Sequence, residues 1–385
     1  MPRSRARARW WRGGPARSVG RTGLRHTGDC NQEQERGTVA IARSTDYRRI
    51  ATEEGWITPE MMRMYLRILE TKSIVDPGFY SLWGFFGTSQ SERARLLFER
   101  IQDIGERRIA DMEAAGIDMQ LLMLTSPGVQ IFDPETATAL SISTNDTVAQ
   151  AIRDRPDRYA GLAAIPPHAP QAAAKELERA VRQLGLKGGL INSHTQGTYL
   201  DDPHYWDIFA AAEALDVPIY LHPNTPPPQM IEPFLSRTLD AAIYGFAVET
   251  GLHALRLIVS GLFDRFPRLQ IVLGHLGEGL PYWLSRVDFM HGGIVRANRS
   301  PGVRALQRRP SDYLRENFHY TTSGMAWEPP ISYVQRVIGH DRVLYAMDYP
   351  YQYVPEEVAA MDALPLDAMQ KRAFFQTNAE RLFRL

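Results

Sequence analysis

Short apolar runs alternate with longer amphipathic stretches along most of the chain. The runs have the length and composition of buried strands, and the stretches between them have helical apolar spacing. An α/β chain with eight strand–helix units favours a closed (β/α)8 TIM barrel over an open sheet. No Gly-x-Gly-x-x-Gly follows the first run, which disfavours a dinucleotide-binding fold. The predicted strands are residues 48–52, 120–124, 159–164, 188–191, 217–221, 271–273, 318–321 and 343–346.

An insertion separates the first two predicted strands. Residues 59–72 have the apolar spacing of a helix, whereas residues 73–90 are rich in glycine and aromatic residues and are predicted to be loop. Residues 91–115 predict one long amphipathic helix, which Gly116 ends. We therefore expect a helical insertion after the first strand.

The first 46 residues differ from the rest of the chain. Eight arginines lie between Met1 and Arg25, and no acidic residue precedes Asp29. The segment has no periodic apolar residues that could be buried in a core. We therefore interpret residues 1–46 as a disordered extension and residues 47–385 as one barrel domain. A transit-like or nucleic-acid-binding tail is the alternative, but we favour an extension without function.

Composition excludes several classes of protein. The formal net charge is zero, which gives no support for nucleic acid or a membrane surface as a partner. No apolar run approaches the ~20 residues of a membrane-spanning helix. The single cysteine, Cys30, rules out an internal disulfide and a cysteine-rich metal site, and it is typical of a cytoplasmic protein.

Polar and titratable residues stand where the predicted strands end. In a barrel these ends meet at one face, where the chemistry of such folds takes place. Two carboxylates and an imidazole suit one divalent metal ion, so we assign Glu53, His222 and Asp348 as its ligands. Glu54 is the rival for the first position, because successive strand residues point to opposite sides. The strand-end residues are Glu53, Thr125, His194, His222, His275 with Glu278, Ser323 and Asp348.

The stretch 271–281, Ile-Val-Leu-Gly-His-Leu-Gly-Glu-Gly-Leu-Pro, places His275 and Glu278 between a strand and a helix. The simple alternative is that Glu278 caps the helix and His275 is a core residue. Taken one at a time, each predicted metal ligand also has a simple alternative explanation, as a loop acid, a turn residue or a helix cap. The gathering of all of them at the strand ends of one face favours the functional interpretation.

Arginines and tyrosines near this face suggest how a substrate is bound. Arg93, on the insertion, and Arg286, on the helix after His275, could each hold a carboxylate by a bidentate fork. The alternative for both is a surface arginine on an amphipathic helix. The tyrosines clustered at 349–353 suit an aromatic ligand or a subunit interface.

Six motifs carry a resemblance to a known family. They are Arg-Arg-Ile-Ala-Thr-Glu-Glu at 48–54, Asn-Ser-His-Thr-Gln at 192–196, Leu-His-Pro at 221–223, Gly-His-Leu-Gly-Glu at 274–278, Tyr-Ala-Met-Asp-Tyr-Pro-Tyr-Gln-Tyr at 345–353 and Thr-Asn-Ala-Glu at 377–380. Together they resemble the non-oxidative decarboxylases of the amidohydrolase superfamily, the aminocarboxymuconate-semialdehyde decarboxylase-like group. Within it the 5-carboxyvanillate decarboxylases are nearest, followed by the γ-resorcylate and 2,3-dihydroxybenzoate decarboxylases. The resemblance covers residues 47–385 and says nothing of residues 1–46.

The resemblance implies roles for individual residues. Glu53, His222 and Asp348 would hold one metal ion, Mn²⁺ or Zn²⁺. Catalysis would use His275 and Glu278, together with Asp348. One departure stands out, because hydrolytic relatives carry His-x-His where this chain has Glu53 and Gly55. The missing ligand would leave room for a bidentate substrate. The substrate-binding candidates are Arg93, Thr125, His194, Arg286 and Tyr351.

These points predict a metal-dependent decarboxylase of an ortho-hydroxybenzoate. By resemblance, the substrate is a small aromatic carboxylate, 5-carboxyvanillate, converted to vanillate in lignin-derived aromatic catabolism. The proton that replaces the carboxylate would come from Asp348 or His275, and the residues leave that choice open. A metal-dependent hydrolase of a lactone or amide is the alternative, and a non-catalytic barrel is a third possibility. We expect a homodimer or homotetramer.

Overall fold

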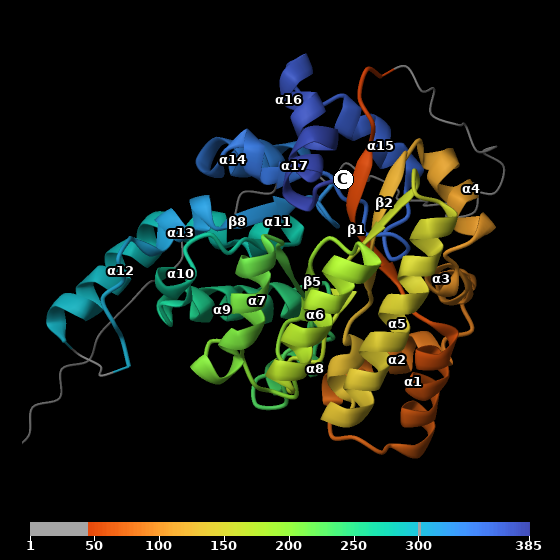
Figure 1. Ribbon diagram of the computed structural model, residues 1–385, viewed down its shortest axis with the longest axis horizontal. Coiled ribbons are helices and arrows are strands. Elements are labelled where there is room, and N and C mark those ends of the chain that lie inside the picture. The colour runs from red at the N-terminus through yellow and green to blue at the C-terminus, as the bar shows by residue number, and fades with distance from the viewer. Residues whose placement is uncertain (1–44, 299–301) are drawn as a thin grey trace, which may run out of the picture. The chain divides into compact units, whose positions relative to one another are not determined.

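The computed structural model of the protein describes residues 45–298 and 302–385 (Figure 1). Neighbouring strands pair in parallel in the orders β1-β2-β3 and β4-β5-β6-β7-β8-β9. Only Leu162 separates β3 from β4, so the two form one interrupted strand. The strands are β1 (Ile50–Trp56), β2 (Met119–Leu124), β3 (Tyr159–Gly161), β4 (Ala163–Ala164), β5 (Gly189–Asn192), β6 (Ile219–His222), β7 (Ile271–Leu273), β8 (Phe318–Thr321) and β9 (Val343–Leu344).

Backbone hydrogen bonds close the strands into a barrel. The N–H of Thr52 donates to the carbonyl of Tyr345 at 3.0 Å, and the N–H of Gly55 donates to the carbonyl of Tyr349 at 2.7 Å. These bonds join β1 to the segment that follows β9, the two ends of the strand order. The predicted eight-stranded barrel is therefore confirmed, with β3 and β4 together as its third strand.

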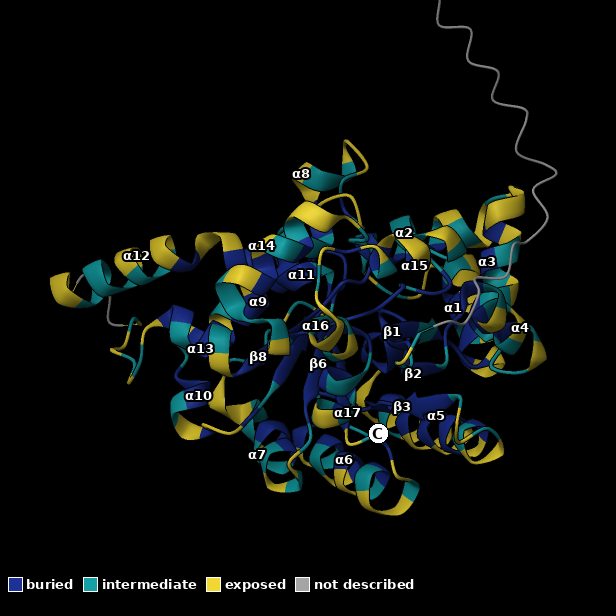
Figure 2. Cartoon of the chain, turned by 90° about the horizontal axis from the view of Figure 1, so that it is seen from above, coloured by how far each residue is buried: buried dark blue, intermediate teal, exposed yellow. Residues whose placement is uncertain are grey.

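Helices cover the outside of the barrel. In Figure 2 the strands are buried, whereas most helices have a buried inner face and an exposed outer face. The longer helices after β2 are α5 (Pro134–Asp154), α6 (Pro170–Leu184), α7 (Trp206–Leu215), α9 (Gly245–Val259), α12 (Leu284–Ala297) and α14 (Glu328–Ile338). The shorter elements are α8 (Glu232–Leu235), α10 (Leu262–Arg265), α11 (His275–Glu278), α13 (Pro310–Glu316), α15 (Pro355–Asp362), α16 (Ala368–Arg372), α17 (Asn378–Phe383), η1 (Gly128–Ile131), η2 (Pro203–Tyr205), η3 (Leu280–Trp283), η4 (His340–Arg342) and η5 (Ala373–Thr377).

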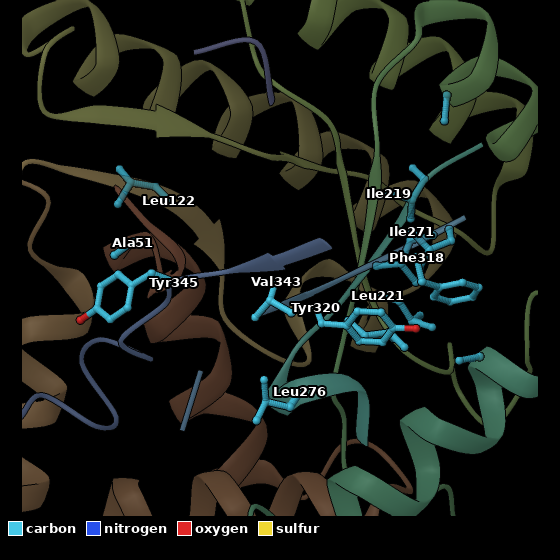
Figure 3. Packing of buried hydrophobic residues seen from close by; sticks show 14 of the residues in the cluster. Ala51, Leu122, Ile219, Leu221, Ile271, Leu276, Phe318, Tyr320, Val343 and Tyr345 are labelled. Carbon is cyan, nitrogen blue, oxygen red and sulfur yellow. The ribbon is translucent and has the colours of Figure 1, made fainter. Parts of the chain in front are cut away.

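Successive strand residues contribute to two different apolar clusters. Leu190 and Tyr220 belong to the cluster that includes the barrel interior. Their chain neighbours Ile191 and Leu221 belong to the cluster between the barrel and its helices, part of which Figure 3 shows. This separation follows from the alternation of side chains along a strand. Inward-facing residues near the strand ends can therefore reach the site.

The insertion between β1 and β2 differs from the prediction. It contains α1 (Pro59–Thr71), α2 (Pro77–Thr88), α3 (Glu92–Gln102) and α4 (Glu106–Ala115). The expected loop at 73–90 is wrong, because Asp76 caps α2 through the N–H of Phe79 and Pro77 opens it.

The single helix expected over residues 91–115 is also wrong. Asp103 ends α3, and its Oδ1 accepts the N–H groups of Gly105 and Arg108 at 2.8 and 3.2 Å. These bonds satisfy the first turn of α4 and break the helix in two.

Two further predictions concern the ends of the first strand and of the chain. β1 runs to Trp56 rather than ending at residue 52, so both glutamates lie inside the strand. The predicted extension falls almost wholly on residues 1–44, which lie outside the described residues. None of the helices that the structure describes is long and apolar enough to span a bilayer.

Candidate active site

Two adjacent glutamates of β1 face opposite sides of the barrel wall. A register shift between Ala51 and Glu54 marks a β-bulge, which adds one residue to β1 relative to β2. Glu53 points into the barrel, where the hydroxyls of Tyr220 and Thr321 both donate to its Oε2. Glu54 turns away from the barrel axis, so Glu53 is the member of the pair that faces the predicted metal site.

The second oxygen of Glu53 has no hydrogen-bond donor among the described residues, although it is buried. It lies 3.7 Å from Nε2 of His222 and 3.9 Å from Nε2 of His275. A Cβ at Gly274 would lie 2.8 Å from both carboxylate oxygens, so only glycine allows this close approach. A buried carboxylate oxygen that faces two imidazoles and lacks a donor is suited to a cation.

The turn after β7 holds His275 and Glu278 in an unusual conformation. Residues 275–279 all have positive φ, including the non-glycine residues His275 (50°), Leu276 (56°) and Glu278 (55°). A left-handed turn of L-residues costs about 1–2 kcal/mol per residue, and such strain clusters at functional sites. The turn brings Nδ1 of His275 within 2.7 Å of Oε1 of Glu278, which orients the imidazole.

Burial and neighbouring charges shift the pKa values of the titratable groups around Glu53. Burial lowers the pKa of His275, yet the neighbouring carboxylates, Glu278 first, outweigh burial and raise the pKa to about 10. Burial raises the pKa of Asp348 to about 8, and Glu53 adds to the rise while His275 opposes it. Burial lowers the pKa of His222 to about 4, so its imidazole is neutral at physiological pH. A cation among these carboxylates would stabilise their charged forms.

The backbone at Asp348 is held by the glutamate that turns outward. Asp348 has a φ of 69°, again in the left-handed region. The N–H groups of Met347 and Tyr349, on either side of it, donate to Oε1 and Oε2 of Glu54 at 3.0 and 3.1 Å. Glu54 therefore holds the backbone on both sides of Asp348, a role that the sequence did not indicate.

Thr125 and Tyr351 meet beside the cluster. Their hydroxyls are 2.5 Å apart, and a Cβ at Gly55 would lie 3.4 Å from Cε2 of Tyr351. Tyr351 and the exposed Arg93 line a cavity of about 520 Å³, a volume suited to a substituted benzoate. The predicted metal ligands Glu53, His222 and Asp348 do not line this cavity.

The other two predicted substrate residues, His194 and Arg286, differ in what their side chains contact. Both ring nitrogens of His194 are engaged by backbone groups, the carbonyl of Thr225 at 2.8 Å and the N–H of Gly197 at 3.1 Å. His194 therefore ties two strand-end loops together and has no free ring nitrogen for a substrate. Arg286 is exposed on α12 and, like Arg93, forms no hydrogen bond or ion pair with another described residue.

Comparison with known proteins identifies the group to which this barrel belongs. The model of the amidohydrolase family matches residues 94–385. The chain belongs to the amidohydrolase family. Among curated amidohydrolase relatives, it is 39% identical to γ-resorcylate decarboxylase of Rhizobium sp. strain MTP-10005 over 350 residues, which cover 88% of this chain and 98% of the relative.

Two solved amidohydrolase structures are also similar. The 5-carboxyvanillate decarboxylase of Novosphingobium aromaticivorans, with manganese and 4-hydroxy-3-methoxy-5-nitrobenzoic acid, is 50% identical with a TM-score of 0.88, covering 91% of this chain and 100% of that one. The 5-carboxyvanillate decarboxylase of Sphingomonas paucimobilis is 39% identical with a TM-score of 0.82, covering 88% of this chain and 99% of that one.

The residues of this amidohydrolase chain fit a divalent cation by their chemistry. Two carboxylates and a neutral imidazole are ligands that Mn²⁺ and Zn²⁺ accept, and the Glu53 oxygen that faces His222 has no other partner. Within residues 45–298 and 302–385, no group of three His, Cys, Asp or Glu side chains lies close enough together to hold a metal ion. The ligand set of Glu53, His222 and Asp348 therefore stays a prediction.

Proposed function

We propose that the protein is a manganese-dependent, non-oxidative decarboxylase of ortho-hydroxybenzoates that converts 5-carboxyvanillate to vanillate. The observation that carries the proposal is the buried Glu53 oxygen, which has no hydrogen-bond donor and faces the imidazoles of His222 and His275. It lies at the end of the barrel where such folds do their chemistry. The likeness to two 5-carboxyvanillate decarboxylases supports the choice of substrate.

The ligand of one relative supports the same chemistry. In 4-hydroxy-3-methoxy-5-nitrobenzoic acid, a nitro group stands beside the hydroxyl. In 5-carboxyvanillate that position carries the carboxylate that would leave as CO₂. The nitro compound therefore resembles the substrate in shape and in its pair of oxygens beside the hydroxyl, but it has no carbon–carbon bond there to break.

Each group of the site then has a task. Glu53, His222 and Asp348 would hold the metal ion, which when bound lowers the pKa of the ortho hydroxyl and fixes the ring. His275 or Asp348 gives a proton to the ring carbon that bears the carboxylate, and Glu278 orients His275 through Nδ1. The bond to the carboxylate then breaks, its electrons restore the aromatic ring, and CO₂ leaves.

Product analysis tests the function directly. Protein loaded with Mn²⁺ and mixed with 5-carboxyvanillate is expected to release vanillate and CO₂ in equal amounts. A hydrolase, the class that the decarboxylase relatives do not favour, would instead cleave lactones or amides without releasing CO₂. Absence of CO₂ from the metal-loaded protein would overturn the proposal.

Arg93 is proposed to bind the second carboxylate of 5-carboxyvanillate, because it lines the same cavity as Tyr351. Replacing Arg93 by Ala is expected to lower kcat/KM for this substrate about two- to fivefold, because an exposed guanidinium that pairs with a carboxylate in solvent contributes roughly 0.5–1 kcal/mol. An ortho-hydroxybenzoate with one carboxylate should lose less. Arg95→Ala, an exposed arginine on the same helix, is the matched control. Equal losses for both substrates would contradict this role.

We also propose that the protein is a homodimer, or a homotetramer built from such dimers. Only Leu284 of α12 is buried, and Tyr282 (71%), Phe289 (73%) and Met290 (46%) are exposed beside it. Figure 1 shows α12 extending away from the strands. A helix that packs on so little of its own chain gains stability from a partner.

Sedimentation tests this assembly. The wild-type protein is expected at two or four times 43.6 kDa, and Phe289→Ser is expected to shift it toward 43.6 kDa. Met369→Ser, which changes another exposed apolar residue on α16, is the control. A wild-type protein that sediments as a monomer at micromolar concentration would exclude the proposal.

A further inference from the structure

A buried arginine of the insertion contacts both segments that carry the predicted acidic ligands, strand β1 and the loop after β9. Arg108, on α4, is completely buried. Its Nη2 donates to the carbonyl of Gly55 at 2.5 Å, two residues after Glu53. Its guanidinium also lies 4.5 Å from the ring centroid of Tyr349, the residue after Asp348. Arg108 therefore contacts the backbone two residues after Glu53 and the side chain of the residue after Asp348.

A second connection runs through side chains of β1 and β2. Nη1 of Arg108 donates to Gln120 at 3.2 Å, and Nε2 of Gln120 approaches Glu54 at 3.4 Å. Glu54 in turn accepts the two N–H groups that flank Asp348. Charge and hydrogen bonds thus lead from α4 through Gln120 and Glu54 to Asp348. A buried guanidinium and a buried carboxyl group are unfavourable unless they are hydrogen-bonded, and Arg108 and Glu54 both have hydrogen-bond partners.

We propose that Glu54 and Arg108 are positioning residues, which hold Asp348 in its left-handed conformation and so fix the direction of its carboxylate. The helical insertion would then support the metal site through Arg108, in addition to covering the barrel. This inference rests on the proposed function, in which Asp348 is a metal ligand.

The geometry explains why a carboxylate is needed at residue 54. Two N–H groups, from the residues before and after Asp348, point at two oxygens of a single side chain. Together they fix both peptide planes around Asp348, whose φ of 69° is unfavourable for an L-residue. A glutamine has only one acceptor oxygen, so one N–H group would face an NH₂ group. That repulsion would let the loop relax and turn the Asp348 carboxylate away from the site.

The test is the affinity of the protein for Mn²⁺, measured without substrate. In Glu54→Gln the dissociation constant is expected to rise about 10- to 100-fold, the usual effect of losing a partner that orients a metal ligand. Arg108→Lys keeps the charge but loses the planar contact with Tyr349, and a rise in the same direction is expected. The spectrum of bound Mn²⁺ should also change in both variants, because the direction of one ligand changes.

Glu249→Gln is the matched control. Glu54 and Glu249 are both completely buried, and Glu249 likewise accepts a hydrogen bond from a strand-end loop, from the hydroxyl of Ser193. A merely structural role would lower Tm in all three variants and leave the Mn²⁺ affinity of each within about twofold of wild type, which would overturn the proposal. If the wild-type protein itself binds no Mn²⁺, the proposed metal site fails instead. Should Glu54→Gln not fold, Arg108→Lys decides the question.

Discussion

Replacing Glu53 by Gln is expected to abolish metal binding and to lower turnover about a thousandfold or more, while the protein stays folded. The hydroxyls of Tyr220 and Thr321 both donate to Oε2, so the amide oxygen of the variant will take that position. Its NH₂ group will then face Nε2 of His222 and of His275, where the carboxylate oxygen now stands. An amide nitrogen is not a metal ligand, and a lost Lewis acid removes several kcal/mol of transition-state stabilisation.

Metal content per chain, turnover and Tm together check this expectation. The metal-free variant should be no less stable than metal-free wild type, because the charge on Glu53 contributes to the raised pKa of Asp348. His222→Ala should lose metal in the same way. Glu176→Gln, which changes a buried acid on α6 that bonds Asn145 and Arg179, should keep both metal and activity. One metal ion per chain in Glu53→Gln would refute the ligand assignment.

The barrel itself could be predicted from the sequence, because it depends on periodicity. Apolar runs of strand length alternate with helical spacing, and this pattern needs no knowledge of side-chain contacts. The insertion shows where that reasoning fails. Glycine and aromatic residues at 77–88 suggested loop, but Asp76 and Pro77 start a helix whose Phe79 and Trp83 are buried. Tertiary packing there outweighs a weak local propensity.

Part of the site could also be predicted from the alternation of strands and helices. Strand order alone brings Glu53, His222 and Asp348 to one end of the barrel. Tyr220 could have been found as well, since it lies two residues before His222 and so faces the same side. What the sequence does not reveal is backbone conformation. The left-handed turn at 275–279 and the β-bulge before Glu54 decide where side chains point, and no residue pattern predicted either.

The substrate residues were the least predictable. His194 occurs in a motif shared with the decarboxylases, yet both its ring nitrogens bond backbone groups of neighbouring loops. Arg93 and Arg286 are long, exposed side chains on helices, and their direction is not fixed by contacts within the described chain. Residue type and strand position predict which groups gather at a face, but contacts decide which of them remain free for a ligand.

Moving the hydroxyl of the substrate is expected to abolish turnover, with kcat/KM falling by about 10⁴-fold or more. The sharpest comparison is between 5-carboxyvanillate, which is 5-carboxy-4-hydroxy-3-methoxybenzoate, and its isomer 5-carboxy-3-hydroxy-4-methoxybenzoate. The two have the same composition, charge and size, but in the isomer the hydroxyl is meta to both carboxylates. The two compounds differ only in that the hydroxyl and the methoxy group exchange places, so a difference in rate reports whether the oxygen beside the leaving carboxylate can ionise.

The isomer lacks two contributions at once. An ionised oxygen beside the leaving carboxylate would bind the metal ion together with it, and would push electrons toward the ring carbon that His275 or Asp348 must protonate. The methoxy oxygen that takes this position in the isomer has no proton to lose and cannot become a phenolate. A meta oxygen can do neither, since conjugation does not place its charge on that carbon. The isomer should still bind as a competitive inhibitor, because its carboxylates can reach Arg93. If it is decarboxylated as fast as 5-carboxyvanillate, the ortho hydroxyl plays no part in the reaction. The free oxygen of Glu53 would then have to serve some other chemistry.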